Sequence, residues 1–117
     1  MATPNLINID TITPVLAAGA VTTSRADIID VSAEFVAKVN SLIIANIDGT
    51  NAADITVEVS ADNGSNYYAI AKTVSVPADA SIVVIGKDNS IYLDETDLLA
   101  VTASANSDLT YAVSYEL

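Results

Sequence analysis

The side chains that most often carry out chemistry in proteins are scarce in this sequence. It has no histidine and no cysteine, so imidazole bases, thiolate nucleophiles and the usual ligands of zinc are absent. Carboxylates, hydroxyl groups and three lysines remain. Two carboxylates several ångströms apart suffice for glycoside hydrolysis, and the candidates for such a pair are Asp48, Asp54, Glu58, Asp62 and Asp94. The few aromatic residues that could grip a sugar are spread along the chain, so we expect no enzyme.

Two turn-rich segments contain the oxygen atoms that a hard cation needs. They are Asp-Gly-Thr-Asn-Ala-Ala-Asp at 48–54 and Asp-Asn-Gly-Ser-Asn at 62–66. Neither has EF-hand spacing, because no alternating acids precede the glycine and no glutamate closes the loop. Aspartate and asparagine also favour turns for backbone reasons alone. We therefore interpret both segments as turns and expect neither metal nor cofactor. A calcium-dependent or carbohydrate-binding module on a fibre or cell surface stays open as an alternative.

Composition indicates an acidic protein with more apolar residues than its own core needs. The formal net charge is −11, and the basic residues are one arginine and three isolated lysines, which argues against a nucleic-acid partner. No apolar run approaches the roughly 20 residues of a membrane helix, and the first residues lack the features of a signal peptide. Hydrophobic residues nevertheless make up 51% of the chain. Since large exposed apolar patches usually mark interfaces, we expect a homo-oligomer or an assembly subunit.

The pattern from Ser41 to Tyr68 predicts strands and turns. The hexapeptide 55–60 alternates apolar and polar residues, which sends the two sets to opposite faces of a sheet. The preceding run 42–45 is apolar at every position, so we expect it to be covered by the core on one face and by a neighbouring segment or subunit on the other. The Asn63-Gly64 pair is a strong hairpin signal because both residues accept positive φ. A helix over 33–42 is a weaker alternative, disfavoured by β-branched residues.

Similar patterns recur to the end of the chain, at 81–85, 90–93, 98–104 and 109–117. The count of about eight or nine short strands predicts an all-β fold, a single-domain antiparallel β-sandwich similar to a jelly roll. Residues 1–22 read as an N-terminal extended arm or a first strand, and residues 23–117 as the sandwich domain. An arm could dock on a neighbouring subunit by strand addition. The candidate interface residues are Leu6, Ile7, Ile9, Ile12, Leu42, Ile44 and Tyr67.

An ordered set of short motifs from residue 41 onward resembles small virion proteins of tailed bacteriophages, particularly those of marine and cyanobacterial phages. The motifs are a Gly-Thr-Asn turn within 47–51, Thr-Val-Glu-Val at 56–59, the segment Ile-Ala-Lys-Thr-Val-Ser-Val-Pro-Ala at 70–78, Ile-Tyr-Leu-Asp-Glu-Thr-Asp at 91–97 and the strand pair within 101–116. Each is weak singly, and their order is what carries the resemblance. The chain departs from the pattern at Pro77-Ala78-Asp79, where Pro-Ala-Gly is usual.

This resemblance implies a non-enzymatic capsid decoration (cement) protein that binds the major capsid protein, or other virion proteins, on the outer surface of the virion. It also implies frequent trimers and synthesis in the host cytoplasm. Charge and the short apolar runs, independently of the resemblance, lead us to expect no nucleic-acid and no membrane partner. A subunit of the tail, neck or fibre base is an alternative, because those parts are built from similar sandwiches.

Overall fold

The computed structural model describes residues 13–32 and 35–117. Within these residues the chain forms nine β-strands and one short 3₁₀ turn. They are β1 (Pro14–Val21), β2 (Ala26–Asp30), β3 (Ala37–Asn46), β4 (Ala53–Ser60), β5 (Tyr68–Val76), β6 (Ser81–Ile85), η2 (Lys87–Asn89), β7 (Ile91–Leu93), β8 (Leu98–Ala103) and β9 (Leu109–Glu116).

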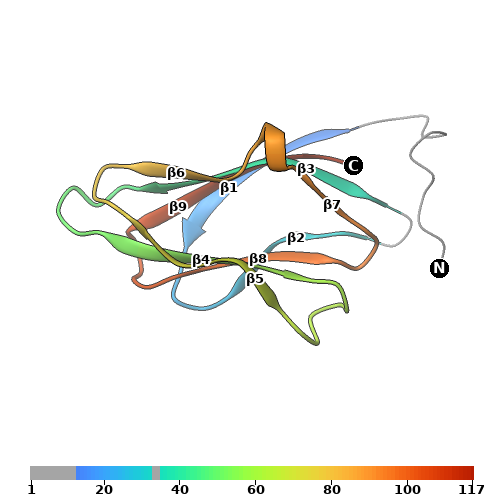
Figure 1. Cartoon of the computed structure of the whole chain (residues 1–117), viewed down its shortest axis with the longest axis horizontal. Helices are drawn as coiled ribbons and strands as arrows, with labels where there is room; N and C mark the ends of the chain where they lie inside the picture. The colour runs from blue at the N-terminus through green and yellow to red at the C-terminus, as the bar shows by residue number, and fades with distance from the viewer. Residues whose placement is uncertain (1–12, 33–34) are drawn as a thin grey trace.

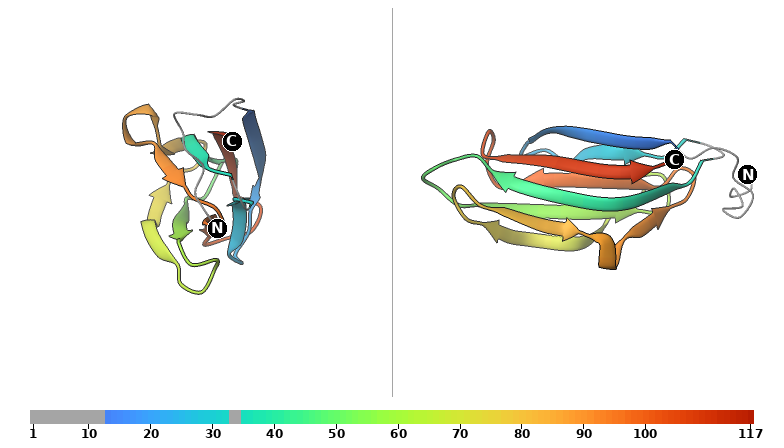
Figure 2. Two further views of the ribbon diagram at one scale, coloured as in Figure 1. Left: turned by 90° about the vertical axis from the view of Figure 1, so that its right-hand side faces the viewer. Right: turned by 90° about the horizontal axis from the view of Figure 1, so that it is seen from above.

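The strands form two antiparallel sheets that pack face to face (Figure 1; Figure 2). Sheet A has the order β1-β9-β3-β6, with β7 also paired to β3, and sheet B has the order β2-β8-β4-β5. Because β6 and β7 pair with different parts of β3, they make one interrupted edge. The strand pairs are then nested, as in a long hairpin rolled into two layers: β1 with β9, β2 with β8, β3 with β6 and β7, and β4 with β5. This is jelly-roll topology, and it confirms the predicted antiparallel sandwich.

Alternation places the side chains of the central strands as the sequence predicts. Ile55 and Val57 of β4 are fully buried in the core, whereas Thr56 and Glu58 on the opposite face are half-buried. In β9, Leu109 and Val113 are fully buried, and the other residues of the same parity also pack against the core: Tyr111, Tyr115 and Leu117. Aliphatic residues from both sheets thus fill the space between the layers.

The run 42–45 of strand β3 is apolar on both faces but is covered on only one face by the described part of the chain. Leu42 and Ile44 are fully buried in the core. Ile43 points to the other face of sheet A and is 39% exposed. The expected second cover of this strand is therefore not supplied by residues 13–32 or 35–117.

Several element boundaries differ from the sequence-based expectation. The weaker alternative of a helix over 33–42 is wrong for its described part, since β3 begins at Ala37. The strand after the Asn63-Gly64 turn, which the sequence predicts at 66–73, lies at 68–76. Asn63 and Gly64 have φ of 58° and 90°, as expected for this pair.

The N-terminal part of the chain contributes one strand to the sandwich. Within the expected arm 1–22, residues 14–21 form β1, and each of its eight residues is in register with a residue of β9. Pro14 stands at the first position of this edge strand, where its missing N–H costs no ladder hydrogen bond. Residues 1–12 of the expected arm, including the candidate residues Leu6, Ile7, Ile9 and Ile12, lie outside the described residues.

Candidate functional site

The outer face of sheet A is almost free of charge. Three successive rows of residues contain only aliphatic and hydroxyl side chains, two of them across β1, β9, β3 and β6 and one across β1, β9 and β3. The charged residues in register on this face are Lys38 and Glu116, which lie in the row at the end near the C-terminus. The uncharged surface, called here the sheet A face, consists of Leu16, Ala18, Ala20, Ser41, Ile43, Ala45, Ser81, Val83, Thr110, Ala112 and Ser114.

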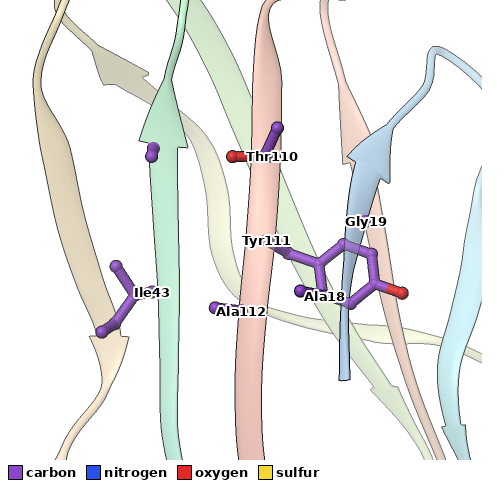
Figure 3. Close-up of a pocket in the computed structure, with 7 residues that line it drawn as sticks. Ala18, Gly19, Ile43, Thr110, Tyr111 and Ala112 are labelled. Atoms are coloured by element: carbon purple, nitrogen blue, oxygen red, sulfur yellow. The ribbon is translucent and has the colours of Figure 1, made fainter. Parts of the chain in front are cut away.

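The sheet A face contains a shallow hollow of about 410 Å³ over β1, β9 and β3 (Figure 3). Small side chains create it, because the neighbouring residues Ala18, Ala112 and Ala45 leave space above the sheet. Ile43 borders it from β3. The lining contains no carboxylate and no amine: Ala18, Gly19, Ile43, Ala45, Thr110, Tyr111 and Ala112. Such a hollow can hold an apolar group, and its polar side-chain groups are the hydroxyls of Thr110 and Tyr111.

Gly19 makes room for the ring of Tyr111. The ring extends from β9 across β1 beside this glycine (Figure 3). A Cβ atom at position 19 would lie 3.3 Å from both Cε1 and the hydroxyl oxygen of Tyr111. The glycine therefore lets the ring pack against the core beneath an edge strand.

The outer face of sheet B differs, because a polar cluster lies over its middle. The Nε of Arg25 donates a hydrogen bond to Glu58 at 3.0 Å, and its guanidinium lies 4.1 Å from the centroid of the Tyr67 ring. The Tyr67 hydroxyl donates to a carboxylate oxygen of Asp27 at 2.8 Å. Asp27 and Glu58 flank Ala100 of β8 in register, and this small residue, fully buried, lies between them. The cluster therefore closes over the middle of the sheet.

Hydrogen bonding shifts the titration of two members of this cluster. The bond to Asp27 raises the pKa of the Tyr67 phenol above its ordinary value, because that bond needs the phenol proton. The bond to Glu58 likewise raises the pKa of the Arg25 guanidinium. Tyr67 was a candidate interface anchor, and the structure places it half-buried in this intramolecular cluster.

The structure corrects the expectation that Leu42 and Ile44 contribute to an interface. Both are fully buried, since alternation in β3 directs them into the core. The exposed residue between them is Ile43, which belongs to the sheet A face. The sequence predicts that the run 42–45 is apolar, but it does not show which of these residues point outward.

The structure does not bring the candidate acids Asp48 and Asp62 together as a carboxylate pair. These residues lie in the loops before and after β4, at opposite ends of that strand. Asp48 accepts a backbone hydrogen bond from Thr50 at 2.8 Å. Asp62 accepts hydrogen bonds from Ser60 and from both the backbone and side chain of Asn66. These bonds lower the pKa of both carboxyl groups. Each carboxylate thus organises its own loop.

The remaining candidate acids have separate places. Asp54 begins the outer face of β4, and its backbone N–H donates to the Ser104 hydroxyl at 2.8 Å. Glu58 binds Arg25, and Asp94 lies in the turn between β7 and β8. Among the described residues no group of three or more acidic residues is arranged to hold a metal ion.

Asn46 is a structural residue that the sequence analysis missed. It is 3% exposed. Its side-chain amide donates to the carbonyl oxygens of Asn51 and Val76, each at 2.9 Å, and its oxygen accepts from the N–H of Asp48. The available signal was a polar residue that ends an apolar run directly before a turn. Asn46 fixes the loop between β3 and β4 against the end of β5.

Comparisons with known proteins support the fold class. No family model matches the chain, and no curated protein matches it. A solved structure described with the words "Bacillus endospore appendages form a novel family of disulfide-linked pili" is similar over 91% of this chain and 85% of that chain, with a TM-score of 0.54 and 14% identity. At this identity the similarity shows the fold alone. The class is thus an antiparallel jelly-roll sandwich; within the described residues no helix is long and apolar enough to cross a membrane.

Proposed function

We propose that this chain is a non-enzymatic structural subunit of an extracellular assembly, and more specifically a decoration protein that binds the major capsid protein on the outer surface of a tailed-phage head. The motif order from residue 41 onward supports the specific proposal, as it resembles small virion proteins. The similarity to a protein described as forming pili supports the general one, because it pairs this sandwich with assembly. The subunit is made in the host cytoplasm and acts on the particle.

The proposal rests mainly on the uncharged sheet A face. A chain with a net charge of −11 repels like-charged surfaces. On the sheet A face the large exposed side chains are instead aliphatic, with Leu16 73% and Val83 64% exposed. Contiguous apolar surface of this kind usually marks an interaction site. Its hollow offers a partner shape as well as apolar area, and the lining contains no carboxylate and no amine.

A pilus-like or other surface-appendage subunit is the second candidate, favoured by the solved structure found in the comparison. That protein is described as disulfide-linked, whereas this chain has no cysteine. An appendage built from this chain would therefore be held together by non-covalent contacts. It would use the same uncharged face, so the two candidates differ in the partner and not in the surface.

Binding to phage heads that lack the protein tests the proposal. Purified wild-type protein is expected to co-sediment with such heads. Ile43→Glu places a charge in the middle of the sheet A face and is expected to abolish binding. Val74→Glu on β5 is the matched control, since Ile43 and Val74 are each 39% exposed, and it should bind like wild type. Absence of wild-type binding, or equal binding by both variants, would overturn the proposal.

A further inference from the structure

We propose that β1 is a self-association edge, at which two copies of this chain pair their β1 strands antiparallel about a two-fold axis and join their A sheets into one continuous sheet. The inference rests on the proposed function in taking the chain to be an assembly subunit, and it names the contact between copies.

The free edges of the two sheets differ in how they are protected. An exposed edge strand invites pairing with another chain, and proteins usually protect such edges with charges, bulges, prolines or short strands. In sheet B, the edge strand β2 is five residues long, has a register shift between Asp27 and Ile29, and carries Asp27 and Asp30. The other edge, β5, has two register shifts, carries Lys72, and contains Thr73 with a φ of 46°. Both edges of sheet B are thus protected.

In sheet A, one edge is protected and the other is not. The edge formed by β6 and β7 is divided into strands of five and three residues by the turn that contains η2. Strand β1 has eight residues, an unbroken register of eight pairs with β9, and no charged residue. Its one proline, Pro14, stands at its first position. Among the edges of the described structure, β1 alone lacks the usual protection along its length.

Side-chain size also suits β1 to pairing. Residues 17–20 read Ala-Ala-Gly-Ala, so the side chains of β1 near its middle are small. The ring of Tyr111, which crosses β1 beside Gly19, packs on the core side of the strand. Residues directly opposite one another in antiparallel strands point to the same face. A register centred on Ala18 therefore places Leu16, which is 73% exposed, beside Ala20 of the second copy, so that a large side chain meets a small one.

Charge favours this contact over others between identical acidic chains. The β9 residues in register with the exposed residues 16, 18 and 20 of β1 are Ser114, Ala112 and Thr110. Pairing at β1 therefore brings no carboxylate opposite a carboxylate along this stretch. The uncharged sheet A face then continues across the two-fold axis and doubles in width. A two-fold contact of this kind differs from the three-copy unit that the resemblance implies, and the mass of the assembly distinguishes them.

The test combines sedimentation with a single cysteine. Wild-type protein is expected to form dimers in a concentration series followed by analytical ultracentrifugation. Because the chain has no cysteine, Ala18→Cys introduces one thiol per copy. Opposite Cα atoms in an antiparallel pair are about 4.5–5.5 Å apart, within the roughly 4.4–6.8 Å that a disulfide spans. Mild oxidation should therefore link Ala18→Cys into dimers and leave Val83→Cys, an exposed control on the opposite edge, largely unlinked.

Two further variants test the association itself. Ala18→Glu places like charges opposite one another at the axis and should weaken dimerisation about tenfold or more, whereas Ala18→Thr, uncharged and suited to a strand, should not. Circular dichroism shows whether both variants fold. If Ala18→Glu does not fold, the Ala18→Cys cross-link still gives an independent result. Lone wild-type monomers, a trimer without the cross-link, or dimers insensitive to Ala18→Glu would overturn the inference. Dimers that pass these tests but do not bind phage heads would contradict the proposed function and leave the inference standing.

Discussion

The side-chain amide of Asn46 donates a hydrogen bond to the carbonyl oxygen of Val76, and the two atoms are 2.9 Å apart. Asn46 ends β3 in sheet A, and Val76 ends β5 in sheet B. The bond therefore connects the two layers at one end of the sandwich. Because the same side chain also binds the backbone at Asn51 and Asp48, all of its polar atoms are used.

Replacing Asn46 with alanine should destabilise the fold by about 2–3 kcal/mol, because backbone groups that it satisfies lose their partners in a buried site. Urea denaturation followed by circular dichroism measures the change in the free energy of unfolding. Asn89→Ala is the control: Asn89 binds the backbone of its own exposed turn, and its loss should cost less than about 1 kcal/mol. Equal effects of the two variants would contradict the role given to Asn46.

The hydrogen bond from Tyr67 to Asp27 should make the stability of the fold depend on pH in the alkaline range. The folded pKa of the phenol is raised above 10.0, so its stabilisation is fully present below the unfolded pKa and is lost as pH rises through the folded pKa. Tyr67→Phe removes this contribution and should show a shallower loss of melting temperature above pH 10. Parallel pH profiles for wild type and Tyr67→Phe would argue against the bond.

The carboxylate of Asp62 should contribute to acid sensitivity. Its folded pKa is lowered from 3.8 by hydrogen bonds with Asn66 and Ser60, so the stabilisation is present above the unfolded pKa and is lost as pH falls through the folded pKa. Asp62→Ala should be less stable than wild type at neutral pH, and the difference should shrink below the unfolded pKa of 3.8. Melting temperatures of the two proteins from neutral pH to below pH 3.8 measure this difference. A difference that stays constant with pH would contradict the role given to the Asp62 carboxylate.

Asp79→Gly should stabilise the turn between β5 and β6 by about 0.5 kcal/mol, since Asp79 has a φ of 58° and glycine adopts positive φ without steric cost. The turn is closed by the N–H of Ala80 donating to the carbonyl oxygen of Pro77 at 3.1 Å. Ala78→Gly, at a neighbouring position without positive φ, should instead destabilise the protein by a similar amount. Chemical denaturation of the two variants should thus give changes of opposite sign, and the same sign for both would refute the explanation.

Local patterns predicted the layers of this fold better than its contacts. Alternation in β4 fixed which residues face the core, and the Asn63-Gly64 pair predicted the positive backbone angles observed there. The outward parity of β3 was missed because a run that is apolar at every position gives no period to read. The positive φ of Asp79 was not predicted from the sequence, although glycine is usual at this position in the proteins that the chain resembles.

The polar contacts could not be predicted because they join distant parts of the chain. Arg25 and Glu58 are 33 residues apart, and Tyr67 and Asp27 are 40 apart. Only the pairing of β2 and β4 with β8 brings these residues onto one face. The sheet A face likewise depends on strand order, since it combines residues from both ends of the chain. Its lack of charge becomes visible only once β1, β9, β3 and β6 lie side by side.

The most direct test of the central claim is the copy number of this protein in purified extracellular particles, measured by quantitative mass spectrometry against a major structural protein of the same particle. The proposed function predicts a fixed ratio of the two proteins that survives repeated purification. Absence of the protein from such particles, with all of it recovered free in the soluble fraction of the cell, would contradict the proposal.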